Sequence, residues 1–446
     1  MRTTLRVLVI AALAAFYVLA ATEHAERVNT SKARGDQSGY MWDGQNVYWN
    51  WHGRQPRVVI GERNRMPLYA GFLALFWKPE ISNDVFFERA KRWNIYLSVV
   101  LILLLIPIFL RHLPALTAAN LTLIVAFGVF IFKAGYVQSE LLFYFLFFTA
   151  FVLCLELFDR RHGRTALWWR AIAAGAAAAA AHLTKAAMLP FVGIFSIVYI
   201  WAAIAERDEP HARVNRLIAA SLVVVAFLAV LSPYLATNKR VFGHYFYNVN
   251  TTFYMWYNDW PEASVGTIKH GDGVGWPQMP ADQLPSARKY WREHTVQQVV
   301  ARIAAGLWDG VWRSYQTFGY FKPLVLYLAI AVAILVRQRR AFGDYIRGNP
   351  AVVLFLAIYG LAYTVGIAFY APVSGTGTTR FLIAHLLPLF FVLSLLFSRE
   401  PYSGTEWSAL GTRVSVAQIQ LAITLMLALD IAFGVWPRLM TTYGGF

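Results

Sequence analysis

An acidic and aromatic stretch follows the first apolar segment of the chain. It reads GDQSGYMWDGQ over residues 35–45 and holds the carboxylates of Asp36 and Asp43 and the ring of Tyr40. A carboxylate positioned beside a hydroxyl or amine can take its proton as a new bond forms, which accelerates such reactions about 10²- to 10⁴-fold. Asp is also favoured at the start of a helix, so a capping role stays open. We predict that Asp36 is the catalytic base.

Two further carboxylates accompany Asp36. Asp43 follows seven residues later, which is two turns along the same face if the stretch is helical. A structural role is favoured for Asp43, although we include it, with Tyr40, among the candidate substrate contacts. Glu140 begins an apolar segment in GYVQSELLFYF, where it either pairs with Lys133 or orients the substrate.

Five basic side chains lie near the ends of apolar segments on the side where we expect Asp36. They are Arg63, Arg65, Lys133, Lys185 and Arg380. A cation at the centre of a membrane helix costs about 2.5 to 3.5 kcal/mol on insertion scales, and much less near an end, where it can snorkel to the surface. Snorkelling is the simple interpretation of each. The alternative is that they bind a phosphate group, with Lys185 and Arg380 as the principal clamps.

The composition places all these residues in a membrane protein. The 446 residues are 58% hydrophobic and 14% charged, and the mean hydropathy is +0.46. Eleven apolar runs approach the roughly 20 residues that cross a bilayer, so we predict an all-α, polytopic bundle of about 11 spans that forms one domain over residues 1–446. The runs lie near 5–22, 95–111, 116–133, 141–158, 171–184, 187–205, 216–236, 322–336, 351–370, 381–397 and 415–435.

Arginines mark alternate loops between these runs. By the positive-inside rule such loops are cytoplasmic, which puts the N-terminus inside and two long segments, 23–94 and 237–321, outside. Within them we expect interfacial helices at 67–77 and 83–93, and an amphipathic helix from about 296 to 311 that rests on the membrane. The first run also fits a cleaved signal peptide, which would leave the remaining topology unchanged.

Several other functions are disfavoured. The formal net charge is +16, but the basic residues are spread over short loops, so membrane lipid explains them better than nucleic acid. Cys154 is the single cysteine and excludes an intramolecular disulfide. The histidines lack metal-ligand spacing. A divalent ion between Asp36 and Glu140 is possible, yet we predict no metal and no cofactor, because Arg and Lys can neutralise a monophosphate.

The order of these features resembles the GT-C superfamily of polyprenyl-phosphate-sugar-dependent glycosyltransferases, which includes protein O-mannosyltransferases and aminoarabinose transferases of lipid A. The pieces that carry the resemblance are Asp36–Tyr40, Arg65–Phe72, SELL at 139–142 and TTRFLIAHLLP at 378–388. The resemblance implies that an acidic residue of the first outer loop is catalytic, and Asp36 is the matching position. Relatives often have Asp-Glu there, whereas this chain has Gln37, so a second carboxylate is not carried over.

We therefore expect an enzyme that transfers a sugar from a polyprenyl-phosphate carrier to an unidentified acceptor. Abundant Ala and Arg suggest a bacterial inner membrane, with the active site on the periplasmic face. The aromatic stretch 245–260 either binds sugar or, as is favoured, marks the membrane interface. The alternative function is a lipid-linked sugar flippase or transporter. Visible inverted repeats, which many transporters have, are missing from the sequence, and the charges gather on one face.

Overall fold

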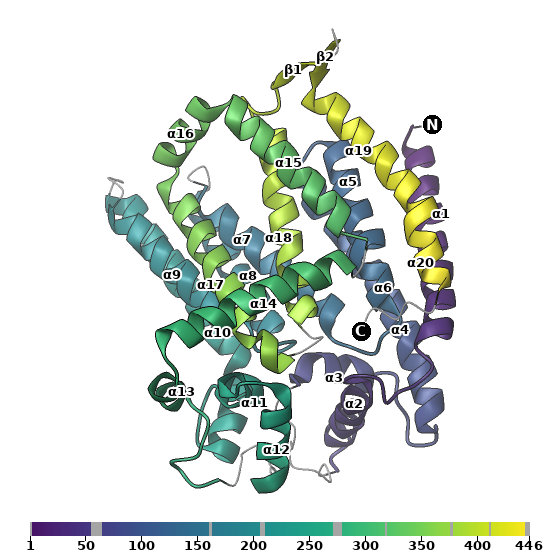
Figure 1. The fold of residues 1–446 in the computed structure, drawn as a ribbon, viewed down its shortest axis with the longest axis vertical. Coiled ribbons are helices and arrows are strands. Elements are labelled where there is room, and N and C mark those ends of the chain that lie inside the picture. Colours follow the sequence, from purple (N-terminus) through teal and green to yellow (C-terminus); the bar gives the residue numbers. More distant parts are fainter. Residues whose placement is uncertain are drawn as a thin grey trace.

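A computed structural model describes residues 2–54, 65–159, 163–205, 210–270, 279–316, 319–374, 378–409 and 412–441. Arg63 lies outside the described residues. Nine helices in the described part of the chain are long and apolar enough to cross a membrane, and a tenth span results if the bent pair α14 and α15 counts as one. The chain is a multi-pass, all-α membrane protein, as expected (Figure 1).

The spanning helices account for most of the expected apolar runs. They are α1 (Arg2–Val28), α4 (Asn83–His112), α5 (Ala115–Val125) with the π-helical η1 (Ala126–Phe130) and α6 (Ile131–Ala134), α7 (Glu140–Leu157), α9 (Met188–Ala205), α10 (Pro210–Phe242), α17 (Pro350–Ser374), α18 (Thr378–Ser398) and α19 (Val416–Asp430) with η4 (Ile431–Val435) and α20 (Trp436–Met440). The run near 322–336 is α15 (Phe321–Arg337), whose 17 residues reach the length of a span only together with α14 (Val296–Gln316), and the two helices are bent by 113°.

The run near 171–184 belongs to α8 (Arg164–His182), which is not among the nine apolar helices. It nevertheless runs alongside α7 from one end to the other. Near its start Arg170 pairs with Glu156 of α7, and just after its end Lys185 pairs with Glu140, 16 residues away on α7 and so about 24 Å along a helix. Gly175 also allows α8 to pack closely on α10, because a Cβ at this position would lie only 2.2 Å from the carbonyl oxygen of Val223.

The first long segment folds into two short helices beside the bundle. They are α2 (Gln37–Trp51) and α3 (Pro67–Ala74), which pack through Gly44 and Leu73. The stretch 83–93, expected as a separate interfacial helix, is instead the first part of α4. Ser82 caps this helix by accepting a hydrogen bond from the Val85 amide, and no helix breaker interrupts it before Pro107. The expected helix at 83–93 is therefore present, but it is continuous with the span and not set apart from it.

The second long segment contains four short elements and the amphipathic helix. The short elements are α11 (Val249–Thr252), η2 (Tyr254–Trp256), α12 (Trp260–His270) and α13 (Ala287–Glu293). Helix α14 lies across α17 and α18 and buries Val299, Gly306 and Gly310 against them. Much of its expected apolar stripe, including Val296, Val300, Leu307 and Val311, stays exposed. Contact of this face with the membrane remains a prediction.

Both long segments lie at the same end of the bundle. Figure 1 shows α2, α3 and α11 to α13 at the lower end. At the upper end lie α16 (Arg339–Gly348) and a small antiparallel hairpin of β1 (Glu406–Ala409) and β2 (Thr412–Ser415), an addition to the expected all-helical fold. The N-terminus also lies at the upper end. Elements far apart in sequence therefore meet at the lower end.

Candidate active site

Asp36 occupies the position just before α2, but its side chain does not cap the helix. Gly35 turns the chain there with a positive φ of 60°, a conformation that glycine adopts without strain. The Asp36 carboxylate instead accepts a hydrogen bond of 2.8 Å from Nη1 of Arg380, at the start of α18, and forms an ion pair with it. About a third of the Asp36 side chain remains exposed. The capping interpretation is therefore not supported.

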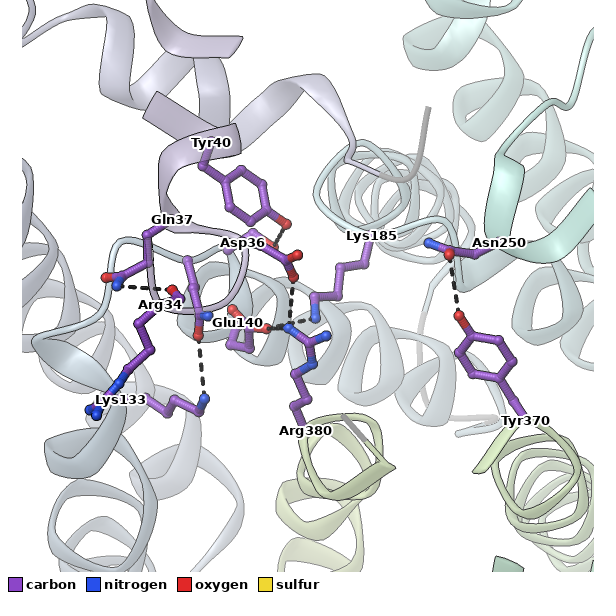
Figure 2. A network of polar contacts seen from close by, with 12 residues as sticks. Arg34, Asp36, Gln37, Tyr40, Lys133, Glu140, Lys185, Asn250, Tyr370 and Arg380 are labelled. Carbon is purple, nitrogen blue, oxygen red and sulfur yellow. Dashed lines mark hydrogen bonds and ion pairs between the residues drawn. The ribbon is translucent and has the colours of Figure 1, made fainter. Parts of the chain in front are cut away.

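Glu140 and Lys185 complete a connected group of charges with Asp36 and Arg380 (Figure 2). Oε1 of Glu140 lies 2.9 Å from Nζ of Lys185 and 3.5 Å from Nη1 of Arg380. Glu140 is the first residue of α7, and Lys185 follows α8, so four distant parts of the chain meet here. The Glu140 side chain is only 2% exposed.

Lys133 and Tyr40 border this charged group. Nζ of Lys133, which is buried, donates to Oε1 of Gln138 at 3.3 Å, and the Tyr40 hydroxyl is hydrogen-bonded to Ser139 Oγ at 2.7 Å. Lys133 also interacts electrostatically with Glu140. Burial raises the pKa of the Tyr40 phenol well above its usual range, so Tyr40 remains a neutral hydrogen-bonding group.

The five charged residues carry two carboxylates against three cations. Because basic side chains outnumber the carboxylates, the group is suited to an anion. Burial lowers the pKa of Lys185, although the neighbouring Glu140 carboxylate opposes this effect. Two buried polar atoms, Oε2 of Glu140 and Nε of Arg380, have no hydrogen-bond partner within the described residues. Unpaired buried polar atoms are costly, so these atoms offer binding sites for a ligand.

Arg65 and Asp43 form a separate pair. Nε of Arg65 lies 2.8 Å from Oδ2 of Asp43, and the guanidinium lies 5.9 Å from the centre of the Tyr40 ring. Gly39 lets Arg65 approach, since a Cβ there would overlap the guanidinium. This pair links the start of α3 to α2, which agrees with the structural role favoured for Asp43. Substrate contact by either residue stays a prediction.

Gln37 anchors the start of α2, which its residue type alone did not reveal. Its fully buried amide accepts hydrogen bonds from Asn29 Nδ2 and the Val137 amide, at 2.7 and 2.9 Å, and donates to Asn29 Oδ1 and the carbonyl oxygens of Ser31 and Arg34. The bond to Val137 ties the start of α2 to the turn before Glu140. The signal in the sequence was that Gln37 stands where proteins of the superfamily that the chain resembles often have Glu after Asp.

Asn250 and Tyr370 stand beside the charged group and were not predicted individually. The Tyr370 hydroxyl donates to Oδ1 of Asn250 at 3.2 Å, and Tyr370 is close enough to interact electrostatically with Arg380 and Asp36. Asn250 belongs to the aromatic stretch 245–260, for which we favoured an interface role. Part of this stretch therefore lies beside the charged group. Its composition suggested such a position but did not establish it.

Comparisons with known proteins support the fold. No family model and no curated protein matches the chain significantly. Among solved structures, apo ArnT from Cupriavidus metallidurans matches with a TM-score of 0.50 at 16% identity, over 100% of this chain and 75% of that one. The same protein bound to undecaprenyl phosphate gives 0.49 at 13% identity, over 99% of this chain and 75% of that one. The chain therefore adopts the fold of the apo ArnT structure, which agrees with the resemblance drawn from its sequence.

Proposed function

We propose that this protein is a membrane glycosyltransferase that moves a sugar from a polyprenyl-phosphate carrier to an acceptor on the periplasmic face of a bacterial inner membrane. The observation that carries the proposal is the ion pair between Asp36 and Arg380, because it places a partly exposed carboxylate beside a cluster with excess positive charge. Such a site can bind a phosphate and accept a proton within one small volume.

The cations would hold the carrier phosphate. Arg380 presents a planar guanidinium that suits two phosphate oxygens, and Lys185 adds a point charge beside it. ArnT from Cupriavidus metallidurans has been crystallised with undecaprenyl phosphate, and we extend a ligand of this class to the present chain. An arriving phosphate would compete with Asp36 for Arg380, so donor binding would release the carboxylate for its own role.

Asp36 would act as the general base. As the acceptor oxygen or nitrogen attacks the anomeric carbon, the bond from that carbon to the phosphate oxygen breaks, and its electron pair leaves with the carrier. The acceptor proton passes to Asp36, and Arg380 and Lys185 balance the charge that develops on the released polyprenyl phosphate. No redox partner is required, and the expectation that no metal or cofactor takes part remains a prediction.

The position of the group suits a lipid substrate. Glu140 and Arg380 are at or near the first residues of the spanning helices α7 and α18, so they would lie where these helices leave the membrane. A carrier lipid cannot leave the bilayer, and only groups held at this depth can reach its phosphate. The two long segments cover the same end of the bundle and would exclude water from the activated sugar.

Purified protein in detergent tests the proposal directly. The full chain would be incubated with undecaprenyl phosphate carrying a radiolabelled sugar and with a fractionated cell-envelope extract as the source of acceptor. We expect labelled product and free undecaprenyl phosphate, because the glycosyl bond is broken. A flippase moves the intact lipid between leaflets and releases no free carrier in detergent, so an unchanged lipid, together with transbilayer movement in vesicles, would favour that alternative.

A further inference from the structure

Asn250 and Tyr370 form a neutral wall beside the charged group. Figure 2 shows both residues on the far side of Lys185 from Glu140, with the amide nitrogen of Asn250 directed toward Lys185. Tyr370 comes from α17, and Asn250 comes from α11 in the second long segment. Both side chains are partly buried and uncharged. The site thus has a charged side that suits phosphate and a neutral side of different chemistry.

The neutral wall is connected to the charged side by Phe381. The Phe381 ring lies edge to face with Tyr370, with ring centres 5.8 Å apart, and Nζ of Lys185 lies 5.0 Å from the centre of the same ring. Arg380 is the adjacent residue on α18. A ligand whose phosphate is held by Lys185 and Arg380 would therefore extend its next group over Phe381 toward Tyr370 and Asn250.

Arg302 holds this wall in place. From α14, its Nε donates to the Phe369 carbonyl oxygen at 2.7 Å, and its Nη2 donates to the Met255 carbonyl oxygen at 3.2 Å. The guanidinium also lies over the rings of Tyr290 and Phe369, at 5.1 and 4.1 Å from their centres. One side chain thus joins α14 to the residue before Tyr370 and to Met255, which follows Asn250 in the same segment, so the wall is preorganised.

The hydrogen-bonding capacity of the wall fits hydroxyl groups. Tyr370 already donates to Asn250 Oδ1, and within the described part of the chain the Asn250 amide nitrogen has no hydrogen-bond partner. The wall therefore offers N–H donors together with free lone pairs on the phenol and amide oxygens. Hydroxyls both donate and accept, whereas an anionic group would gain less from neutral partners.

We propose that Asn250 and Tyr370 form the subsite that binds the hydroxyl groups of the transferred sugar, and that this sugar is neutral where it meets them. This inference rests on the proposed function, since it assumes that the charged side holds the carrier phosphate. On this proposal, the second long segment and α17 determine the specificity for the sugar, and the charged group binds the carrier.

Binding measurements separate the subsite from the chemistry. We would measure the affinity of the full-length protein in detergent for undecaprenyl phosphate and for undecaprenyl phosphate carrying glucose or arabinose. The ratio of the affinity for the loaded carrier to the affinity for the bare carrier measures how much the sugar contributes to binding. We expect wild type to bind at least one loaded carrier more tightly, and Asn250→Ala and Tyr370→Phe each to reduce this preference about 2- to 10-fold, as expected for a lost neutral hydrogen bond, with the bare carrier bound as before.

Matched controls come from the same segment. Asn258→Ala and Tyr245→Phe make the same chemical changes at exposed positions of the second long segment and should leave the ratio unchanged. An unchanged ratio in Asn250→Ala and Tyr370→Phe, or a ratio of one in wild type, would overturn the subsite while leaving carrier binding intact. Equal loss of bare and loaded carrier would also overturn it, because the residues would then act through the structure of the site. If wild type binds neither lipid, the proposed function itself fails.

Discussion

Arg380 and Asp36 are separated by 344 positions in the chain, yet Nη1 of Arg380 lies 2.8 Å from the Asp36 carboxylate. The same nitrogen reaches Glu140 at 3.5 Å, so one guanidinium joins the first long segment, α7 and α18. This contact brings the proposed base and the proposed phosphate clamp together. Replacing either residue by a neutral one therefore leaves the charge of the other without this partner.

Asp36→Asn should abolish most transfer activity. The amide keeps the size of the carboxylate and can still accept a hydrogen bond from Arg380, but it cannot take a proton. We expect normal expression and donor binding that is at least retained, with the transfer rate reduced by about two orders of magnitude or more. Initial rates with a labelled donor measure this. Asp43→Asn is the control and should retain far more activity, and a near wild-type rate for Asp36→Asn would reject the base assignment.

Replacing the cations should weaken donor binding. Arg380→Met and Lys185→Met keep an apolar stem and remove the charge, so each should raise the apparent dissociation constant of the carrier phosphate. Lys185→Met also leaves Glu140 buried without its closest cation, which commonly costs about 3 to 5 kcal/mol of stability. The double variant Lys185→Met/Glu140→Gln removes this charge and serves as the control for folding. Unchanged carrier affinity in both single variants would mean that these residues serve only their ion pairs with Glu140 and Asp36.

Gln37→Glu should lower stability even though it would create the Asp-Glu pair common among the proteins that the chain resembles. A carboxylate can accept from Asn29 and Val137, but it would oppose the carbonyl oxygens of Ser31 and Arg34, to which the amide now donates. A buried group left unsatisfied costs about 1 to 3 kcal/mol, and more if it is charged. Thermal unfolding would measure the loss, with Gln297→Glu at an exposed position of α14 as the control. Equal melting temperatures for the two variants would contradict the prediction.

Gly175→Ala should destabilise the bundle. A methyl group there would lie 2.2 Å from the Val223 carbonyl oxygen, so α8 and α10 would have to move apart. Gly193→Ala in α9 is the matched control, because nothing lies within 4 Å of the added carbon and alanine favours helix formation. Melting temperatures in detergent should fall for the first variant and stay equal or rise for the second. The reverse order would show that α8 and α10 are not packed so closely.

Cysteine labelling tests the orientation. Single cysteines at positions 50 and 270 lie in the two long segments and should react with a membrane-impermeant maleimide from outside the cell, if arginine-rich loops are cytoplasmic. The native Cys154 is buried and should give little background. Labelling only after permeabilisation would invert the assignment for both segments.

The sequence by itself determined the all-α class, the positions of the apolar helices and the residues most suited to the chemistry. These follow from local properties: an apolar run about 20 residues long forms a helix in a bilayer, and charges collect at its ends. The helical repeat also located α14. Local composition was a weaker guide for α8, whose short apolar run lies between Arg170 and Lys185, and for 83–93, where the capped helix continues into a spanning helix.

Only the tertiary structure decided which of the candidate residues meet. Asp36, Glu140, Lys185 and Arg380 belong to one group, whereas Arg65 pairs with Asp43 and holds the helix that follows Asp36. The roles of Gln37, Asn250 and Tyr370 likewise depend on partners up to 120 positions away. The physical reason is that a charge near the end of a helix is equally compatible with snorkelling and with a site. Its partner depends on how the helices pack, and no local pattern encodes that arrangement.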